Sequence, residues 1–183
     1  MSEYELFTPA KWDVKPRKLW AADNEAYMLG FDPNRFFTWI RKMEPYRDSC
    51  LFVAVPDVVG NAIATLELYR EWAWHFDGWP LAFVAQDGQE NLPLPNYYDT
   101  LFVGGSTEWK VSDAAVSVIK RAQGMHKHIH IGRVNWWKRY AYFRLIEGSE
   151  SWTCDGTRAT FDGRENTKSA WNGYMAQKPL IRI

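Results

Sequence analysis

The sequence predicts an α/β fold in which parallel strands alternate with helices, and three observations support it. Short apolar runs recur along the chain, and most of them precede an amphipathic stretch. The runs are apolar throughout, as expected for strands of a parallel sheet covered by other layers. Each run ends on a side chain capable of chemistry. The runs are LWAADNEAY (19–27), LFVAVPDVVG (51–60), LAFVAQDG (81–88), LFVGGSTEWK (101–110), HIHIGRVN (128–135) and the weaker ESWTCDG (150–156).

The first half of the chain is predicted to hold four strands and two long helices. A helix over 34–44 begins after Asp32, which is suited to an N-cap, and Pro33, which suits the first helical position; Pro45 ends it. Asn61 caps a second helix that runs to residue 76. The strands of this half are expected at 4–7, 19–23, 51–55 and 81–85.

The second half continues the alternation. Residues 87–99 are polar and contain prolines, so we expect a loop with at most one helical turn. A helix over about 112–123 has Ser112 as its N-cap and Gly124 as its stop, and another is expected over about 136–147. Strands are expected at 100–104, 128–132 and 150–155, with a short closing strand at 180–183.

Two architectures are compatible with this alternation: an open doubly wound sheet and a (β/α)8-type TIM barrel. No G-x-G-x-x-G motif follows the first strand, which weakens the dinucleotide-binding form of the open sheet. Polar residues at the ends of several strands favour the barrel, whose active site gathers at the carboxyl ends of its strands. We predict one domain over residues 1–183, as a minimal or trimmed barrel, because complete barrels usually need about 200 residues or more.

Composition excludes several classes of protein. Basic and acidic residues number 22 each, and the charge divides into −5 over residues 1–91 and +5 over 92–183. The basic half is compatible with a phosphate-bearing partner, although such a split also occurs on plain solvated surfaces. The only cysteines, Cys50 and Cys154, form neither a disulfide framework nor a thiolate zinc site. With no apolar leader and no run of roughly 20 apolar residues, we expect a cytoplasmic protein without membrane contact.

Tryptophan is abundant, with 11 residues in the chain. Large aromatic side chains are usually buried in cores or grooves, so their number alone indicates no function. The tryptophans expected in the core or in a groove are Trp20, Trp39, Trp72 and Trp74.

The ordered motifs DNEAY, VPDV, AQDG, GGSTEWK, HIG and CDGTR resemble those of the tRNA-guanine transglycosylase superfamily. Within this superfamily, the resemblance is closer to the short phage and bacterial DpdA-type proteins, which insert 7-deazaguanine bases into DNA. The motifs that carry it are VPDVVG, AFVAQDG, GGSTEWK and HIGRVN. The resemblance covers about residues 19–160. The chain departs from the family in two respects: it lacks the cysteines of the structural zinc site, and it has Glu25-Ala26 where the family has Gly-Gly.

The resemblance implies a retaining base exchange by two carboxylates, with Asp155 as the nucleophile and Asp23 as the general acid/base. Other interpretations remain open at this point: Asp23 can cap a turn, and Asp155 can be a turn residue before Gly156.

The same resemblance implies a guanine pocket. Asp57 would accept the two N–H donors of the base edge, Gln86 would donate to the base carbonyl, and Tyr27 would stack on the base or pack as a half-buried core residue. The backbone of Gly104 and Gly105 would add a hydrogen bond. The rim residues are Ser106, Glu108 and Trp109, although Glu108 could instead pair with Lys110 on the surface.

Histidines and basic residues complete the candidate set. His126, His128 and His130 share a strand face, but no acidic or cysteine partner accompanies them, so we expect no metal and interpret His130 as a strand residue with a satisfied hydrogen bond. The residues expected to contact phosphates, or else to form a solvated helix face, are Arg133, Lys138, Arg139, Arg144, Arg158 and Arg164.

The expected function is a transglycosylase without a cofactor that replaces guanine in DNA, with RNA as the less favoured partner, by a 7-deazaguanine base such as 7-cyano-7-deazaguanine. A target base in a duplex would have to be flipped out or single-stranded. Two alternatives are an N-glycosidase that leaves an abasic site and a non-catalytic nucleic-acid-binding subunit.

Overall fold

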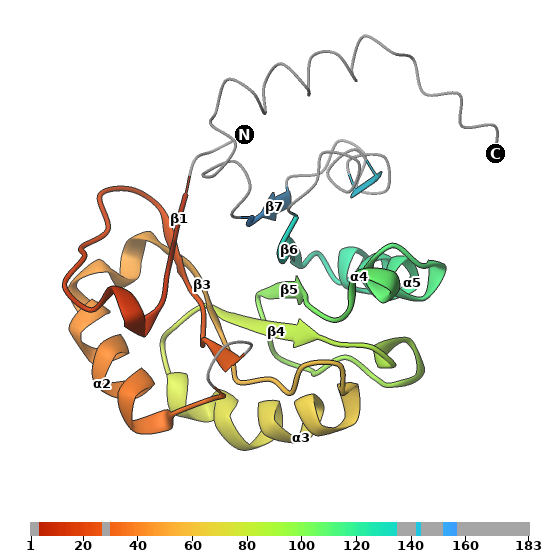
Figure 1. Ribbon diagram of the computed structural model, residues 1–183, viewed down its shortest axis with the longest axis horizontal. Coiled ribbons are helices and arrows are strands. Elements are labelled where there is room, and N and C mark those ends of the chain that lie inside the picture. Colours follow the sequence, from red (N-terminus) through yellow and green to blue (C-terminus); the bar gives the residue numbers. More distant parts are fainter. Residues whose placement is uncertain (1–3, 27–29, 135–141, 144–151, 157–183) are drawn as a thin grey trace, which may run out of the picture.

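The computed structural model describes residues 4–26, 30–134, 142–143 and 152–156, and it contains one curled sheet of seven parallel strands that forms a half-barrel (Figure 1). Each strand pairs with the next one along the chain. The strands are β1 (Glu5–Phe7), β2 (Trp20–Ala22), β3 (Cys50–Ala54), β4 (Leu81–Ala85), β5 (Thr100–Val103), β6 (His128–Ile131) and β7 (Trp152–Cys154). The predicted α/β class with parallel strands is confirmed.

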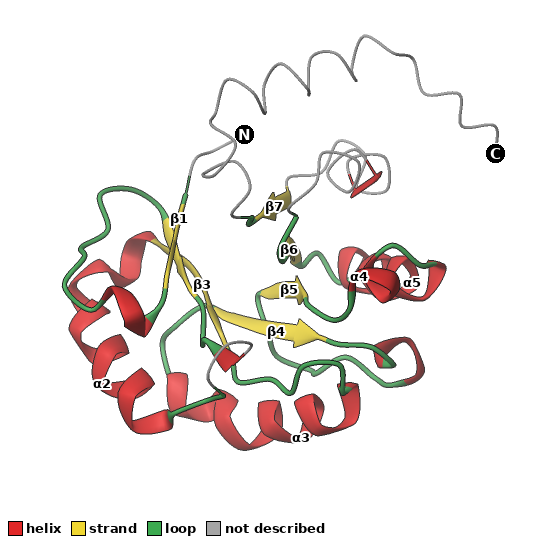
Figure 2. Ribbon diagram, in the orientation of Figure 1, coloured by secondary structure: helices red, strands yellow, loops and turns green. Residues whose placement is uncertain are grey.

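Helices lie along the outer, convex side of the curved sheet (Figure 2). The expected N-caps are confirmed: the side chains of Asp32, Asn61 and Ser112 accept hydrogen bonds from the backbone three residues further on, at 3.1, 3.0 and 3.4 Å. The helices are α2 (Pro33–Met43), α3 (Ala62–Trp72), α4 (Thr107–Lys110) and α5 (Asp113–Gly124), joined by the 3₁₀ turns η1 (Pro9–Lys11), η2 (Glu44–Ser49), η3 (Ala73–Phe76) and η4 (Gln89–Asn91).

The sheet has two apolar faces because side chains alternate along each strand. The convex face packs against the helices, and the buried residues of α2 that meet it are Phe36, Trp39, Ile40 and Met43. The concave face is a smaller cluster that fills the inside of the curve with mostly small or aromatic side chains: Ala21, Phe52, Ala54, Ala82, Val84 and Phe102. The apolar runs of the sequence therefore correspond to strands covered on both sides.

The first and last described strands approach each other across the concave side. The hydroxyl of Tyr4, the residue before β1, donates to the carbonyl of Cys154 at the end of β7 over 2.7 Å. The Tyr4 ring also meets the ring of His130 in β6 edge-on, with centroids 5.8 Å apart. The curl is therefore strong enough for residues far apart in the sequence to share one interior.

Several local expectations require correction or lie outside the described residues. The α-helix α2 ends before Pro45, as expected, although at Met43; the chain then passes directly into the 3₁₀ turn η2, because a proline is tolerated in the first turn of a new helical segment. Trp74 is 70% exposed and so is not a core residue, but it lines a groove near Leu81. The segment after Gly105 forms the short helix α4, which is not among the helices expected from the sequence. Nearly all of the helix expected over 136–147, and the strand at 180–183, fall outside the described residues.

Among the described residues, we find no helix of the length and apolar character needed to cross a bilayer.

Candidate active site

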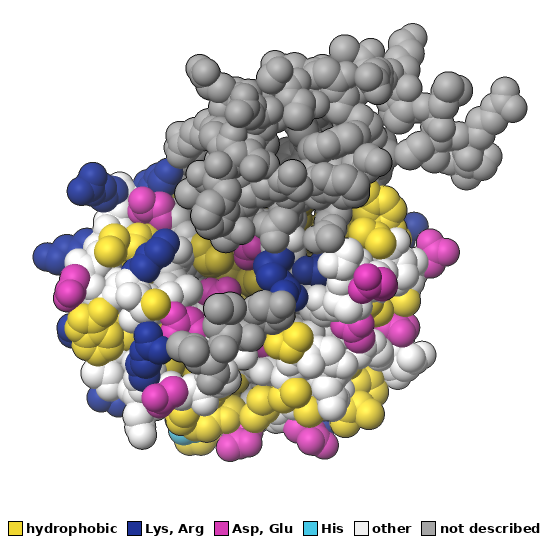
Figure 3. Space-filling model, in the orientation of Figure 1, with side chains coloured by type: hydrophobic (Ala, Val, Ile, Leu, Met, Phe, Trp, Pro, Cys, Tyr) yellow, Lys and Arg dark blue, Asp and Glu magenta, His cyan; other side chains and the backbone are white. Residues whose placement is uncertain are grey.

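Polar side chains and glycines follow the strands at one edge of the sheet. Because all strands are parallel, their carboxyl ends meet at this edge, where the active sites of barrel-type folds gather. Figure 3 shows basic and acidic side chains lying close together near the middle of one face of the molecule. The residues predicted for the site that occupy strand ends are Asp23, Asp57, Gln86, Gly104, Arg133 and Asp155, after β2, β3, β4, β5, β6 and β7 respectively.

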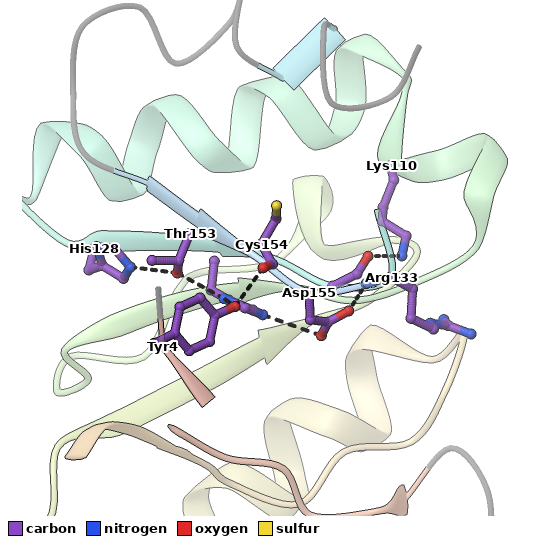
Figure 4. Close-up of polar contacts among 9 residues, drawn as sticks. Tyr4, Lys110, His128, Arg133, Thr153, Cys154 and Asp155 are labelled. Carbon is purple, nitrogen blue, oxygen red and sulfur yellow. Dashed lines mark hydrogen bonds and ion pairs between the residues drawn. The ribbon is translucent and has the colours of Figure 1, made fainter. Parts of the chain in front are cut away.

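Asp155 is surrounded by hydrogen-bond donors and positive charge (Figure 4). Its Oδ1 accepts the backbone N–H of Arg133, and its Oδ2 lies 3.4 Å from Nε2 of His130. Burial on its own would raise the pKa of Asp155, but the hydrogen bond and charge of His130, the Arg133 N–H and the charge of Lys110 outweigh it, so the pKa lies below its usual range. Asp155 is therefore ionised at neutral pH.

Asp23 is buried too, but its environment acts in the opposite direction. Burial raises the pKa of Asp23, the N–H of Glu25 opposes this at 2.8 Å from Oδ1, and the negative charge of Asp155 raises the pKa further. His130 lowers it by a smaller amount. Asp23 and Asp155 follow β2 and β7 at the same edge of the sheet, and the charge of Asp155 acts on Asp23. The contact with Glu25 also fits the alternative in which Asp23 caps a turn.

Asp57 is held by two amide side chains. Asn24 Nδ2 donates to its Oδ1 at 2.9 Å, and Gln86 Nε2 donates to its Oδ2 at 2.7 Å. Burial raises the pKa of Asp57 to about 6, assisted by the charge of Asp23 and opposed by the two amides and by Arg133. The carboxyl group is therefore oriented rigidly and titrates close to neutral pH.

Gln86 is fixed in one orientation by contacts at both ends of its amide. Its Oε1 accepts the backbone N–H groups of Gly60 and Gly105, each at 2.9 Å, while its Nε2 donates to Asp57. The side chain is only 2% exposed. Gln86 thus ties three loops of the rim together and keeps one Nε2 hydrogen for another acceptor, so donation to a base carbonyl stays a prediction.

The two glycines after β5 are required by close packing. A Cβ on Gly104 would lie 2.7 Å from Nε2 of Gln86, and one on Gly105, whose φ is +71°, would lie 2.6 Å from Oδ2 of Asp87. Asp87 in turn binds the next residue twice, through the backbone N–H of Ser106 at 2.7 Å and its hydroxyl at 2.5 Å. The Gly-Gly-Ser segment is therefore clamped between two strand-end loops.

Both candidate catalytic aspartates accept a backbone N–H from a non-glycine residue with positive φ. Glu25, with φ of 60°, donates to Asp23, and Arg133, with φ of 55°, donates to Asp155. Left-handed backbone is unfavourable for such residues and occurs where the surrounding structure imposes it. The side chain of Glu25 is held in place by a hydrogen bond from the N–H of Ala10 at 2.9 Å and by an ion pair with Arg35 at 3.1 Å.

The basic residues of the rim point inward. Lys110 is 2% exposed and donates to the carbonyl of Gly132 at 2.7 Å, so the lysine is buried and not on the surface. The guanidinium of Arg133 donates to the carbonyl of Gly105 at 3.2 Å. Glu108 is exposed at the start of α4. The charge of Lys110 acts on Asp155, and that of Arg133 acts on Asp57.

Part of the predicted site lies outside the described residues. These positions are Tyr27, Lys138, Arg139, Arg144, Arg158 and Arg164. Their expected contacts with a base or with phosphates stay predictions.

Sequence reasoning missed several residues of the site. The sequence around three of them does not indicate a place in the site, because their hydrogen-bond partners are distant in the sequence. These residues are Asn24, Asp87 and Lys110. His130 was expected to make a structural hydrogen bond, and it does, but its approach to Asp155 was not foreseen. The adjacency of Asn24 to Asp23 at a strand end was the one hint available.

The cavity that reaches the described part of this rim, lined in part by Asn24 and Glu25, is small, at about 150 Å³. The described part of the chain contains no group of three or more histidine, cysteine or acidic side chains arranged to hold a metal ion. A groove of about 640 Å³ lies at the other end of β4, near Leu81, with Trp79 and the exposed Trp74 in its lining. We place the candidate site at the rim, because the coupled carboxyl groups lie there and not in the groove.

Comparisons of the chain with protein-family models, with curated proteins and with solved structures each gave no match. The family resemblance of the motifs is thus an expectation, and the chemistry has to be inferred from the rim itself.

Proposed function

We propose that the protein is a base-exchange transglycosylase that replaces guanine in a polynucleotide, most simply DNA, with a 7-deazaguanine base. One observation carries the proposal: Asp23 and Asp155 follow β2 and β7 at one rim, and their surroundings displace their pKa values in opposite directions. A pair of carboxyl groups whose environments separate their pKa values is suited to divided acid and nucleophile roles.

In the proposed first step the ionised carboxylate of Asp155 attacks C1′ of the nucleotide and forms a glycosyl ester. The bond from C1′ to N9 of guanine breaks, and the departing base takes a proton from Asp23. In the second step the 7-deazaguanine gives its N9 proton to Asp23 while N9 attacks C1′. The ester bond then breaks, Asp155 returns as a carboxylate, and both groups recover their starting protonation.

The carboxyl group of Asp57 is the proposed reader of the base. Guanine and 7-deazaguanine share an N1–H and an exocyclic amine on one edge, and a carboxylate can accept both donors side by side. Asn24 and Gln86 leave further lone pairs on the oxygens of Asp57 while fixing their direction. The spare hydrogen of Gln86 would meet the base carbonyl, and the base would lie against the Gly104–Gly105 backbone.

We further propose that the curled sheet belongs to a trimmed (β/α) barrel. The support is the hydrogen bond from Tyr4 to the end of β7, together with the apolar interior cluster, since closed barrels fill their interior with side chains from several strands. Arg133 and the basic C-terminal half would face the phosphates, and a duplex would present its target base flipped out.

Radiolabelled guanine incubated with the protein and DNA tests the proposal directly. We expect label to enter DNA, and mass spectrometry of the nucleosides to detect the modified base when 7-cyano-7-deazaguanine is supplied. The same assay with RNA decides between the two polymers. Abasic DNA without inserted base would indicate an N-glycosidase, and salt-dependent DNA binding without any exchange or cleavage would indicate a binding subunit.

A further inference from the structure

A chain of polar side chains runs through the interior of the sheet beneath Asp155, and the proposed exchange step does not use it. His130 is fully buried between the rings of Phe52 and Phe102, at centroid distances of 4.8 and 4.5 Å. A buried imidazole among aromatic rings is costly unless its ring nitrogens are hydrogen-bonded. Both nitrogens have partners, which indicates an arranged network and not a chance contact.

The partners of His130 come from β7, from the residue after it and from the residue before β1. Its Nε2 faces Oδ2 of Asp155 at 3.4 Å, and its Nδ1 lies 2.9 Å from Oγ1 of Thr153 and 3.2 Å from the hydroxyl oxygen of Tyr4. The same Oγ1 of Thr153 lies 2.8 Å from Nε2 of His128. Figure 4 shows this line of contacts from His128 through Thr153 to Asp155.

The hydrogen-bond directions can be derived from the donors available. Tyr4 gives its single proton to the carbonyl of Cys154, so toward His130 its oxygen only accepts. Thr153 has one proton and can either donate to Nδ1 of His130 or accept from it. A neutral His130 is then served by Thr153 as donor, with Thr153 accepting from His128. A protonated His130 is served by the oxygens of Tyr4 and Thr153 as acceptors.

Both cases leave the same group opposite Asp155. A neutral ring with its proton on Nδ1 could also donate to Tyr4 or Thr153, but it would set a bare Nε2 lone pair against the ionised carboxylate of Asp155, which repels it. In the other neutral form, and in the charged ring, Nε2 carries a proton that the carboxylate accepts. The charge of Asp155 therefore selects the forms of the ring that donate from Nε2, and Thr153 can serve Nδ1 in either of them.

We infer that His130, held by Thr153 and Tyr4, is a positioning residue that donates from Nε2 to Asp155 and keeps this carboxylate ionised and aimed at the sugar carbon. The catalytic role of this orientation rests on the proposed function. The hydrogen bond itself can be tested without any activity. Asp155 is then fixed from two sides, by His130 at Oδ2 and by the Arg133 N–H at Oδ1.

Other ionisable groups face this network, and each has to be considered in a pH experiment. Burial and His130 lower the pKa of His128 to about 4, and burial raises the pKa of Cys154 to about 12, so neither changes charge between pH 5 and 9. Burial likewise raises the pKa of Tyr4. Within the described ranges, the other charged groups that act on or contact His130 and Asp155 are Asp23, Lys110 and Arg133.

The first test needs no variant and no activity. Nitrogen-15 NMR of the full chain labelled at histidine, at pH 7, should show a proton bonded to Nε2 of His130, with His130→Gln used for the assignment. A bare Nε2 at pH 7 would overturn the inference.

The second test measures the pH profile of base exchange at saturating guanine, so that the protonation of Asp57 near pH 6 does not set the acid limb. Replacing His130 with Leu should raise the apparent pKa of the acid limb by about one unit or more, since a donor that favours the ionised carboxylate is lost. His130→Gln, whose amide N–H can reach the same place, should recover most of the shift. The matched control is His126→Asn, at an exposed histidine outside the network, which should leave the profile unchanged.

The outcomes separate the two proposals. If the wild-type chain exchanges bases but His130→Leu, shown to be folded by circular dichroism, keeps the wild-type profile, the positioning inference is wrong and the function stands. If the wild-type chain exchanges no base while Nε2 of His130 is protonated, the proposed function is wrong and the hydrogen-bond inference stands.

Discussion

Asp23 and Asp155 sit in comparable depth at the same rim, yet their surroundings differ in almost every other respect. Asp155 faces the Arg133 N–H, the ring of His130 and the charge of Lys110, whereas Asp23 has one backbone N–H and a negative neighbour. Burial raises the pKa of both groups, so the opposite outcomes come entirely from their partners. The comparison teaches that the burial of a carboxyl group at this rim does not determine its protonation state. The hydrogen-bond donors and charges around the group determine it.

The largest effect is expected from Asp155→Asn. An amide cannot form the glycosyl ester, so base exchange should fall by more than about 10⁴-fold, and a covalent adduct between protein and sugar should no longer be trapped by acid quenching. The control is Asp48→Asn, which removes an exposed carboxylate in η2, before the amino end of β3. Exchange that persists at the wild-type rate would assign the nucleophile elsewhere.

Asp23→Asn should have a smaller effect, because it removes a proton shuttle and not the attacking group. A loss of about 10²–10⁴-fold in exchange is expected, with the adduct still formed on substrates whose leaving base needs no proton. The measurement compares guanine with a better leaving base in DNA under single-turnover conditions. Equal losses for both bases would contradict the division of roles between the two aspartates.

Gly132→Ala tests the packing that lets the β6 loop reach Asp155. A Cβ at this position would collide with the ring of Phe102, so a loss of about 1–3 kcal/mol in the free energy of unfolding is expected, measured by urea titration. Gly124→Ala is the matched control, because a Cβ on Gly124 at the end of α5 meets nothing within 4 Å. Equal stability of the two variants would show that the loop adjusts freely.

The smallest effect concerns the third carboxyl group. Because burial raises the pKa of Asp57 to about 6, it accepts the guanine donors above this pH and becomes protonated below it. KM for free guanine should therefore be constant above about pH 7 and rise about tenfold for each pH unit below 6. A KM that does not change between pH 5 and 8 would remove Asp57 from base recognition.

Much of the fold could be predicted from the sequence because its signals are local. Apolar runs define the strands, and the short polar side chains of Asp32, Asn61 and Ser112 mark helix starts through contacts three residues away. The strand-end positions of Asp23, Asp57 and Asp155 followed from the same alternation. Element ends were less accurate where a proline or a short 3₁₀ turn continued a helix, as at η2.

The connections within the site could not be predicted, because they are made between loops that meet only in the folded sheet. Nothing near Gln86 in the sequence indicates that its amide holds Gly60 and Gly105, and nothing near Lys110 indicates that it is buried against Gly132. His130 reaches Asp155 over 25 sequence positions. Such contacts depend on strand order and curl, which composition and periodicity leave open.

The hydrogen bond from Tyr4 to Cys154 has a consequence for how the protein is made. It joins residues 150 positions apart, so it forms only after almost all of the described chain has left the ribosome. Until then Asp23 and Asp57 stand at the rim without Asp155, and the interior is open on one side. Under the proposed function, a nascent chain would therefore lack its nucleophile until β7 has paired with β6 and Tyr4 has met Cys154.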